Sequence, residues 1–237
     1  MFDFTDQVAI VTGAAGNLGE AVARAFYAAG TGLVLVNRSL ERLEATFADL
    51  ADSERCLFAT VDLTDAGAVE GMVYEAVKHF GRVDVLANVA GGFKGGSPVH
   101  ETPLETWDFL LNLNARTTFL ASRAVIPHMI QQGRGKIVSV AARAGLQGKA
   151  KMAAYTVSKS AVIRLTESMA AELNDKGINV NCIVPGTIDT PQNRRDMPKA
   201  DFGKWVSPEE IASVILFLAS DAARAVQGAA VPVYGRS

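Results

Sequence analysis

The sequence predicts an α/β fold: a single doubly wound domain with a seven-stranded parallel sheet flanked by helices. Two observations predict it. Short β-branched runs alternate with helical patterns along the 237 residues, an order typical of parallel sheets with helical crossovers. The runs are also apolar continuously rather than at every second residue, as strands covered by helices on both faces are.

The elements follow one another regularly along the chain. Seven runs are expected to form strands, at residues 7–13, 32–37, 56–62, 83–89, 135–140, 178–184 and 229–234. Helical periodicity places helices at about 18–29, 40–50, 66–80, 104–129, 152–175 and 208–219. Residues 190–208, "TPQNRRDMPKADFGKWVSP", are polar, proline-bearing and aperiodic. Because ligands of such sheets bind beyond the carboxyl ends of the strands, and this segment follows one such end, we expect it to be the substrate loop.

Composition narrows the class of protein. With 49% hydrophobic residues and no internal linker, the chain is expected to form one domain over residues 1–237. A formal charge of −2 favours a small-molecule substrate over nucleic acid. There is no basic leader and no run of about 18 apolar residues, so we expect a cytoplasmic protein that does not bind membranes. Cys56 and Cys182 are isolated in apolar runs, which indicates structural burial rather than a metal or redox site.

A glycine motif joins the first strand to the first helix. In "VTGAAGNLGEAV", residues 11–22, the glycines are Gly13, Gly16 and Gly19. Glycines at this spacing let the backbone approach a pyrophosphate and bring it to the helix N-terminus, where free N–H groups and the helix dipole favour an anion. The motif opens the first unit of a regular strand–helix alternation, and it therefore predicts a dinucleotide site.

The tips of the second and third strands indicate which dinucleotide binds. An Asp in place of Asn37 would accept from both ribose hydroxyls and repel a 2′-phosphate, whereas Asn37 is neutral and Arg38 can pair with that phosphate. We therefore expect NADP(H) to be favoured over NAD(H); the alternative for Arg38 is a solvated loop cation. Asp62 is suited to accept from the adenine amino group, although helix N-capping by Thr64 or Asp65 is an equally good use of such residues.

Five segments carry a family resemblance. In their order and intervals "TGAAGNLG", "VDLTD", "NVAG", "YTVSK" and "VPGTIDT" resemble the short-chain dehydrogenase/reductase family over the whole chain. The resemblance implies a Rossmann-type fold, a nicotinamide cofactor, no metal, and a catalytic group of Asn, Ser, Tyr and Lys. The residues that match this group are Asn114, Tyr155 and Lys159. It also implies a homo-oligomer, a tetramer or dimer formed through helices 104–129 and 152–175, whose surfaces are apolar on more than one face.

The same resemblance implies the residues that contact the cofactor. They belong to the glycine motif, to the tips of the strands and to the catalytic helix: Gly13, Gly16, Asn17, Leu18, Gly19, Asn37, Arg38, Asp62, Leu63, Asn88, Ala90, Gly91, Tyr155, Lys159, Pro185, Gly186, Ile188 and Thr190.

The chain also departs from the family pattern. The position of the catalytic Ser is occupied by Ala142, and Ser139 stands where the family has a structural residue. A glycine falls at Gly16 rather than one residue later, and Val89 replaces a common Asn. These changes, with "VAGGFKGG" at 89–96 and "DTPQNRRDMPKADFGKW" at 189–205, resemble the dihydropteridine reductase branch. The end of the chain, residues 208–228, resembles ordinary bacterial members instead, and Asn37 replaces an Asp of that branch.

The chemistry centres on a tyrosine and a lysine one helical turn apart. A phenol with a pKa of about 10 exchanges protons poorly near neutrality. We expect the ammonium of Lys159 to lower the pKa of Tyr155, because the two side chains share a helix face. Tyr155 would then donate a proton to the substrate heteroatom while the nicotinamide delivers hydride to the adjacent carbon. The resemblance assigns to Asn114 the holding of a water near Lys159.

Three functions remain open from the sequence. The first is reduction of an activated C=N or quinonoid ring, such as quinonoid dihydropteridine, which needs less polarisation of its heteroatom than a ketone and so tolerates Ala142. The second is an ordinary carbonyl reductase or alcohol dehydrogenase, including a 3-oxoacyl thioester reductase. The third is a non-catalytic nucleotide-binding sensor, against which the presence of both Tyr155 and Lys159 weighs.

Overall fold

Seven parallel strands form one sheet in the order β3-β2-β1-β4-β5-β6-β7 in the computed structural model, which describes residues 2–236. The strands are β1 (Val8–Thr12), β2 (Gly32–Asn37), β3 (Cys56–Thr60), β4 (Val85–Asn88), β5 (Gly135–Val140), β6 (Ile178–Pro185) and β7 (Ala230–Val233). Every predicted strand is present. The order reverses between β1 and β4, and a crevice at such a switch point is where parallel α/β sheets bind ligands.

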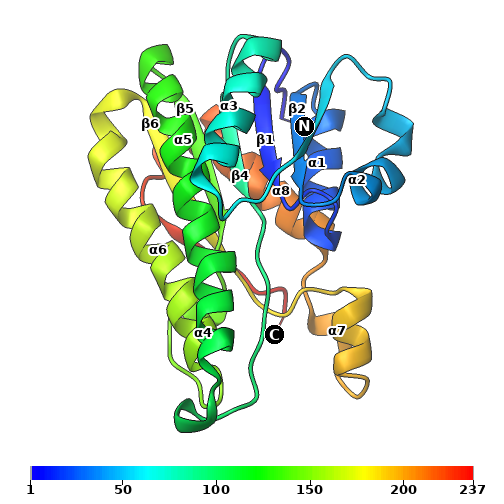
Figure 1. Cartoon of the computed structure of the whole chain (residues 1–237), viewed down its shortest axis with the longest axis vertical. Helices are drawn as coiled ribbons and strands as arrows, with labels where there is room; N and C mark the ends of the chain where they lie inside the picture. Colours follow the sequence, from blue (N-terminus) through cyan, green and yellow to red (C-terminus); the bar gives the residue numbers. More distant parts are fainter. Residues whose placement is uncertain (1, 237) are drawn as a thin grey trace.

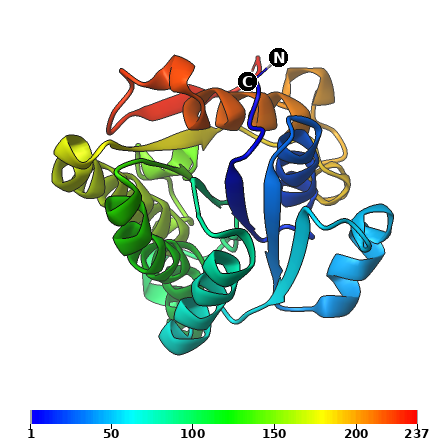
Figure 2. The same ribbon diagram turned by 90° about the horizontal axis from the view of Figure 1, so that it is seen from above.

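Helices cover both faces of the sheet (Figure 2). On one face lie α1 (Asn17–Ala28), the short α2 (Leu40–Thr46) and α8 (Pro208–Ala219); on the other lie α3 (Ala66–Phe80), α5 (Thr117–Gln132) and α6 (Ala153–Leu173). Two large apolar clusters fill the space between helices and sheet, one on each face. All five residues of β1 are buried, and this double coverage explains why the strands are continuously apolar. The doubly wound fold is therefore confirmed.

The helix expected over residues 104–129 is interrupted, which corrects the prediction. It begins as α4 (Leu104–Leu110), passes through one π-helical segment (Leu111–Arg116), and continues as α5 to Gln132. The hydroxyls of Thr117 and Thr118 donate to the carbonyls of Leu113 and Asn114, at 2.7 and 2.8 Å. Such back-bonding competes with the helical ladder and accompanies its irregularity here.

Two further segments differ from the predictions. The helix expected at 40–50 ends at Thr46 and is followed by a 3₁₀ turn at Ala48–Leu50. The segment 190–208 is not aperiodic throughout, because it contains the short helix α7 (Pro191–Asp196), capped by the Thr190 hydroxyl, and a 3₁₀ turn at Phe202–Lys204. In Figure 1, α4 and α7 lie at the lower end of the molecule, beyond the carboxyl ends of the strands. Within residues 2–236, no helix has the length and apolarity needed to cross a membrane.

Candidate active site

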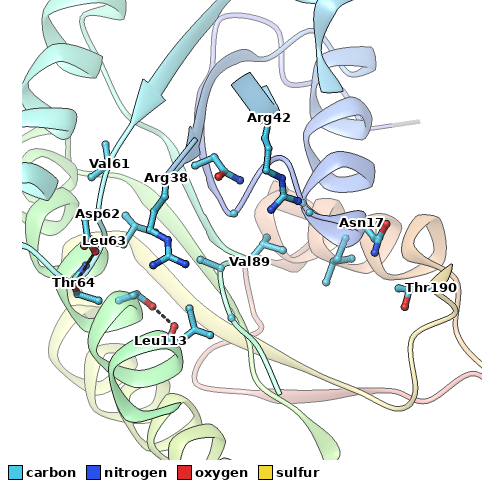
Figure 3. Close-up of a pocket in the computed structure, with 18 residues that line it drawn as sticks. Asn17, Arg38, Arg42, Val61, Asp62, Leu63, Thr64, Val89, Leu113 and Thr190 are labelled. Carbon is cyan, nitrogen blue, oxygen red and sulfur yellow. Dashed lines mark hydrogen bonds between the residues drawn. The ribbon is translucent and has the colours of Figure 1, made fainter. Parts of the chain in front are cut away.

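A cavity of about 350 Å³ opens at the carboxyl ends of β1, β2 and β4 (Figure 3). Most of the cofactor contacts expected from the sequence line it: Gly13, Gly16, Asn17, Leu18, Gly19, Asn37, Arg38, Asp62, Leu63, Ala90, Gly91 and Thr190. The cavity is also lined by residues that the sequence did not predict as cofactor contacts: Arg42, Val61, Thr64, Val89, Leu113 and Thr117. The cavity therefore brings together residues from six separate segments of the chain.

The glycine motif gives this cavity a wall of bare backbone. Gly13 has a φ of +67°, and a Cβ atom there would lie 2.8 Å from the Cα of Ala90. A Cβ atom on Gly19 would overlap the carbonyl oxygen of Gly13. Helix α1 follows Gly16 without any side-chain cap, so its first N–H groups stay available to a ligand. Uncapped N–H groups and close backbone approach are what the pyrophosphate of a dinucleotide requires, and the site fits such a cofactor.

Two arginines extend into the region beyond the tip of β2. The guanidinium groups of Arg38 and Arg42 both extend into the cavity in Figure 3. Arg38 makes no hydrogen bond or ion pair with residues 2–236, whereas one nitrogen of Arg42 donates to the Ala15 carbonyl at 2.9 Å. The side-chain oxygen of Asn37 accepts from the backbone N–H of Ser39 at 3.1 Å. The cavity thus presents two cations and no carboxylate at the tip of β2. Arg42 lies in α2, whereas Arg38 precedes the N-cap Ser39 of that helix, so no helical spacing in the sequence links the two.

Asp62 lies on the opposite wall of the cavity. One of its carboxylate oxygens accepts from the backbone N–H and the hydroxyl of Thr64, at 2.9 and 2.7 Å. These hydrogen bonds, the backbone one first, hold the pKa of Asp62 below its usual value. The cap of α3 is Asp65, which accepts from the N–H groups of Gly67 and Ala68. Capping is therefore the task of Asp65, and the second oxygen of Asp62 is left free of hydrogen bonds within residues 2–236.

Lys159 and Asn114 meet behind the loop that follows β4. Lys159, on α6, is only 5% exposed, and its Nζ donates to the Val140 carbonyl at 2.8 Å. Burial lowers the pKa of Lys159 to about 8. A Cβ atom on Gly91 would lie 2.8 Å from Oδ1 of Asn114 and 3.1 Å from Nζ of Lys159. Only a residue without a side chain fits between these two groups.

Asn114 holds that loop in place from the π-helical segment. Its Oδ1 accepts from the Gly92 N–H at 2.9 Å, and its Nδ2 donates to the Gly92 carbonyl at 3.0 Å and to the Ser158 hydroxyl at 3.0 Å. The fully buried amide is thus occupied by the protein itself. The expected role of Asn114 in holding a water stays a prediction.

Tyr155 presents an unpaired phenol. Its hydroxyl makes no hydrogen bond with residues 2–236, and its ring meets the edge of Phe93, with the ring centroids 4.9 Å apart and the planes at 87°. Burial raises the pKa of Tyr155 to about 12. The expected lowering by Lys159 is therefore wrong for this structure, because the Lys159 ammonium bonds the Val140 carbonyl and desolvation of the phenol dominates.

Several predicted residues lie away from the cavity. Asn88 is 3% exposed and its Nδ2 donates to the hydroxyls of Ser122 and Ser139, so it links β4 to its neighbours. Pro185, Gly186, Ile188, Tyr155 and Lys159 are not on the cavity wall either, and their cofactor contacts stay predictions.

Two other predictions concern hydroxyl and thiol groups. Ser139 is fully buried and bonded to Asn88, as expected of a structural residue. Of the two thiols, Cys182 is buried but Cys56 is only half-buried. Within residues 2–236, no group of three or more His, Cys, Asp or Glu side chains is arranged to hold a metal ion.

Comparison with known proteins places this site in a family. Residues 7–201 match the model of the short chain dehydrogenase family. The chain is 35% identical over 240 residues to the (2S)-[(R)-hydroxy(phenyl)methyl]succinyl-CoA dehydrogenase subunit BbsD of Thauera aromatica, covering 97% of this chain and 96% of that protein. It is 34% identical over 242 residues to the 3-oxoacyl-[acyl-carrier-protein] reductase FabG of Thermotoga maritima, covering 97% and 96%.

Solved structures agree with these relatives. A xylitol dehydrogenase with bound NAD⁺ superposes with a TM-score of 0.90 at 31% identity, covering 98% of this chain and 99% of that chain. ElxO with bound NADP gives 0.89 at 27% identity, covering 97% of each. The nucleotide cavity, the residues of α6 and these similarities lead to one conclusion: the chain belongs to the short-chain dehydrogenase family and is an NAD(P)-dependent oxidoreductase.

Proposed function

We propose that this protein is an NADPH-dependent reductase of a carbonyl group, with Tyr155 as its proton donor. The observation that carries the proposal is the phenol of Tyr155, which has no hydrogen-bond partner within residues 2–236 and lies one helical turn before the buried Lys159 on α6. The relatives favour a carbonyl or alcohol substrate, because their names describe dehydrogenases of hydroxyl compounds and an oxoacyl reductase. A protein that only binds a nucleotide has no use for this pair.

The two arginines support the preference for NADPH. Arg38 and Arg42 can both approach a 2′-phosphate on the adenosine ribose, and no carboxylate at the tip of β2 repels it. Charge-assisted hydrogen bonds of guanidinium to phosphate are strong and geometrically specific. NADH lacks this phosphate, so the same arginines contribute little to its binding.

The catalytic residues have separate roles in this mechanism. When bound, the reduced nicotinamide supplies a hydride to the substrate carbon. With a pKa of about 12, Tyr155 stays protonated at neutral pH and can donate its proton to the developing oxyanion. The role proposed for Lys159 is to bind the nicotinamide ribose with its ammonium, a charge that the fold keeps buried and whose pKa burial lowers to about 8. Asn114 fixes the backbone of Gly92, which directly follows the cavity-lining residue Gly91.

A second candidate substrate is an activated C=N or quinonoid ring, such as quinonoid dihydropteridine. The observation that favours it is Ala142, which is 7% exposed and offers no hydroxyl to a carbonyl oxygen. Ser139, three residues earlier, cannot replace that donor because it is fully buried. The dihydropteridine-reductase-like segments at 89–96 and 189–205 support the same candidate.

One substitution separates the two candidates. In Ala142→Ser the added hydroxyl supplies the missing donor, and turnover of a ketone should rise by up to about a hundred-fold, the contribution of one such donor. For an activated ring the rate should stay constant or fall, because an unpaired hydroxyl must be desolvated. The measurement is kcat/KM with NADPH on one ketone and one quinonoid compound. Ala144→Ser is the matched control, since Ala144 lies in the same segment and is equally buried.

We also propose an assembly and a lid. Large apolar side chains stay exposed on α4, α5 and α6, among them Phe109, Phe119 and Val157, which supports the expected dimer or tetramer through these helices. Sedimentation of the purified protein tests it.

Residues 190–208 are proposed to cover the substrate, because Thr190 lines the nucleotide cavity and α7 follows it directly. The cytoplasmic location stays a prediction from the sequence.

A further inference from the structure

A second cavity, of about 150 Å³, lies next to the catalytic helix and is separate from the nucleotide cavity. Its walls are the loop that follows Phe93, the start of α4, and the first residues of α6. Ala154 is part of the wall and directly precedes Tyr155 in the chain. Phe93, which directly precedes the lining residue Lys94, packs its ring against Tyr155. The cavity is therefore adjacent to the proposed proton donor.

The N-terminus of α6 opens into this cavity without a cap. The helix is 21 residues long and begins at Ala153, and the preceding Met152 provides no side-chain hydrogen bond. Within residues 2–236, the backbone N–H groups of Ala153 and Ala154 have no acceptor. Free N–H groups and the positive end of the helix dipole favour an anion at such a position.

The hydroxyl of a largely buried threonine is a second feature of this cavity, independent of the helix. Thr106 is only 6% exposed and lines the cavity, yet its Oγ1 has no hydrogen-bond partner within residues 2–236. The neighbouring Thr102 bonds the Pro98 carbonyl, and Thr117 and Thr118 bond carbonyls of their own helix. The Thr106 oxygen is not among the fully buried unpaired atoms, so it is open to the cavity and can pair with a group that occupies it.

The charges around the cavity have one sign. Lys94 and Lys151 both line it, and neither forms an ion pair within residues 2–236. No Asp or Glu is among the residues described as lining the cavity. Two ammonium groups, two free N–H groups and a hydroxyl form a donor set that suits oxygen atoms carrying negative charge.

We propose that this second cavity binds an anionic group of the substrate, a carboxylate or a phosphate, while the substrate's carbonyl carbon lies at Tyr155. The inference rests on the proposed function and narrows it to keto compounds that carry an acid group a short chain away from the carbonyl. The acid group would position the substrate and lower KM. It would take no part in proton transfer.

The test compares acids with neutral partners of the same shape. With NADPH, 4-oxopentanoate is measured against its methyl ester, and dihydroxyacetone phosphate against dihydroxyacetone. The wild type should prefer at least one acid over its neutral partner by about ten-fold or more in kcat/KM. Lys151→Gln should remove most of that preference through KM, and Thr106→Val, which keeps the side-chain shape, should reduce it several-fold. Neutral substrates should not change. Lys149→Gln is the control, because Lys149 is exposed on the same loop but does not line the cavity.

A binding measurement separates this inference from the proposed reaction. Succinate and inorganic phosphate are titrated calorimetrically into the protein saturated with NADP⁺. Binding that Lys151→Gln weakens about ten-fold would support the anion site even if no carbonyl compound were reduced, in which case the proposed function fails alone. If neither anion binds and neither acid is preferred, the anion site is wrong, whereas reduction of the neutral ketones would still support the proposed function. Which acid is preferred identifies the anion as carboxylate or phosphate.

Discussion

Replacing the buried lysine should stabilise the protein while it abolishes turnover. The fold keeps the Lys159 side chain 5% exposed, and its pKa falls from 10.5 to about 8 because burial disfavours the charged form. The unfolded chain holds the proton up to about pH 10.5, so between the two values it binds more protons than the folded chain. Stability therefore rises with pH between about pH 8 and pH 10.5. Below about pH 8 the buried charge destabilises the folded protein by its full amount.

The free-energy cost of burying the Lys159 charge gives the stability change expected for Lys159→Met. A lowering of the pKa from 10.5 to about 8 amounts to about 3 kcal/mol at pH 7 and about 1.5 kcal/mol at pH 9.5. Methionine removes this penalty but also the hydrogen bond to the Val140 carbonyl, which contributes about 1 kcal/mol. The variant should thus be about 2 kcal/mol more stable at pH 7, and the difference should nearly vanish at pH 9.5.

The assay is equilibrium urea unfolding of wild type and variant without cofactor at both pH values. Lys149→Met is the control, because Lys149 is exposed and its replacement should change stability little. A variant that is no more stable than wild type at pH 7 would refute the reasoning, as would a gain in stability that does not shrink at pH 9.5. Loss of NADPH oxidation in the same variant should accompany the gain, since the active site holds this charge at the expense of stability.

Four other substitutions test the remaining roles. Tyr155→Phe keeps the packing against Phe93 and should lower kcat by about 10² to 10⁴-fold; a variant with more than about a tenth of the wild-type rate would exclude Tyr155 as the proton donor. Arg38→Ala and Arg42→Ala should each weaken NADPH binding by about ten-fold to a hundred-fold, measured by fluorescence titration, with NADH little affected; an unchanged preference would refute the 2′-phosphate assignment. Gly91→Ala places a methyl group 2.8 Å from Asn114 Oδ1 and should lower kcat/KM without unfolding the chain, as monitored by circular dichroism; wild-type activity would show that this contact is tolerated.

Local patterns along the chain determined much of this protein. The continuous apolar runs predicted all seven strands, because most strands of the sheet are packed between helices; only the edge strands β3 and β7 are partly exposed. The glycine spacing placed the dinucleotide cavity, since that turn depends on backbone freedom within a single strand–helix unit. Tyr155 and Lys159 could be paired because residues four apart share a face of any α-helix.

Contacts between distant segments decided the rest. The π-helical segment is tied to Gly92 through Asn114, and periodicity within one helix carries no trace of that contact. Burial of the Tyr155 ring by segments distant in the chain raises the pKa of its phenol to about 12. The lowering of this pKa that we expected from Lys159 therefore does not occur in this structure. The second cavity is formed by the loop after β4 together with the starts of α4 and α6, and its unpaired Thr106 hydroxyl could be recognised only once those segments were in place. Strand and helix periods are properties of neighbouring residues, whereas burial and hydrogen-bond satisfaction depend on how the whole chain packs.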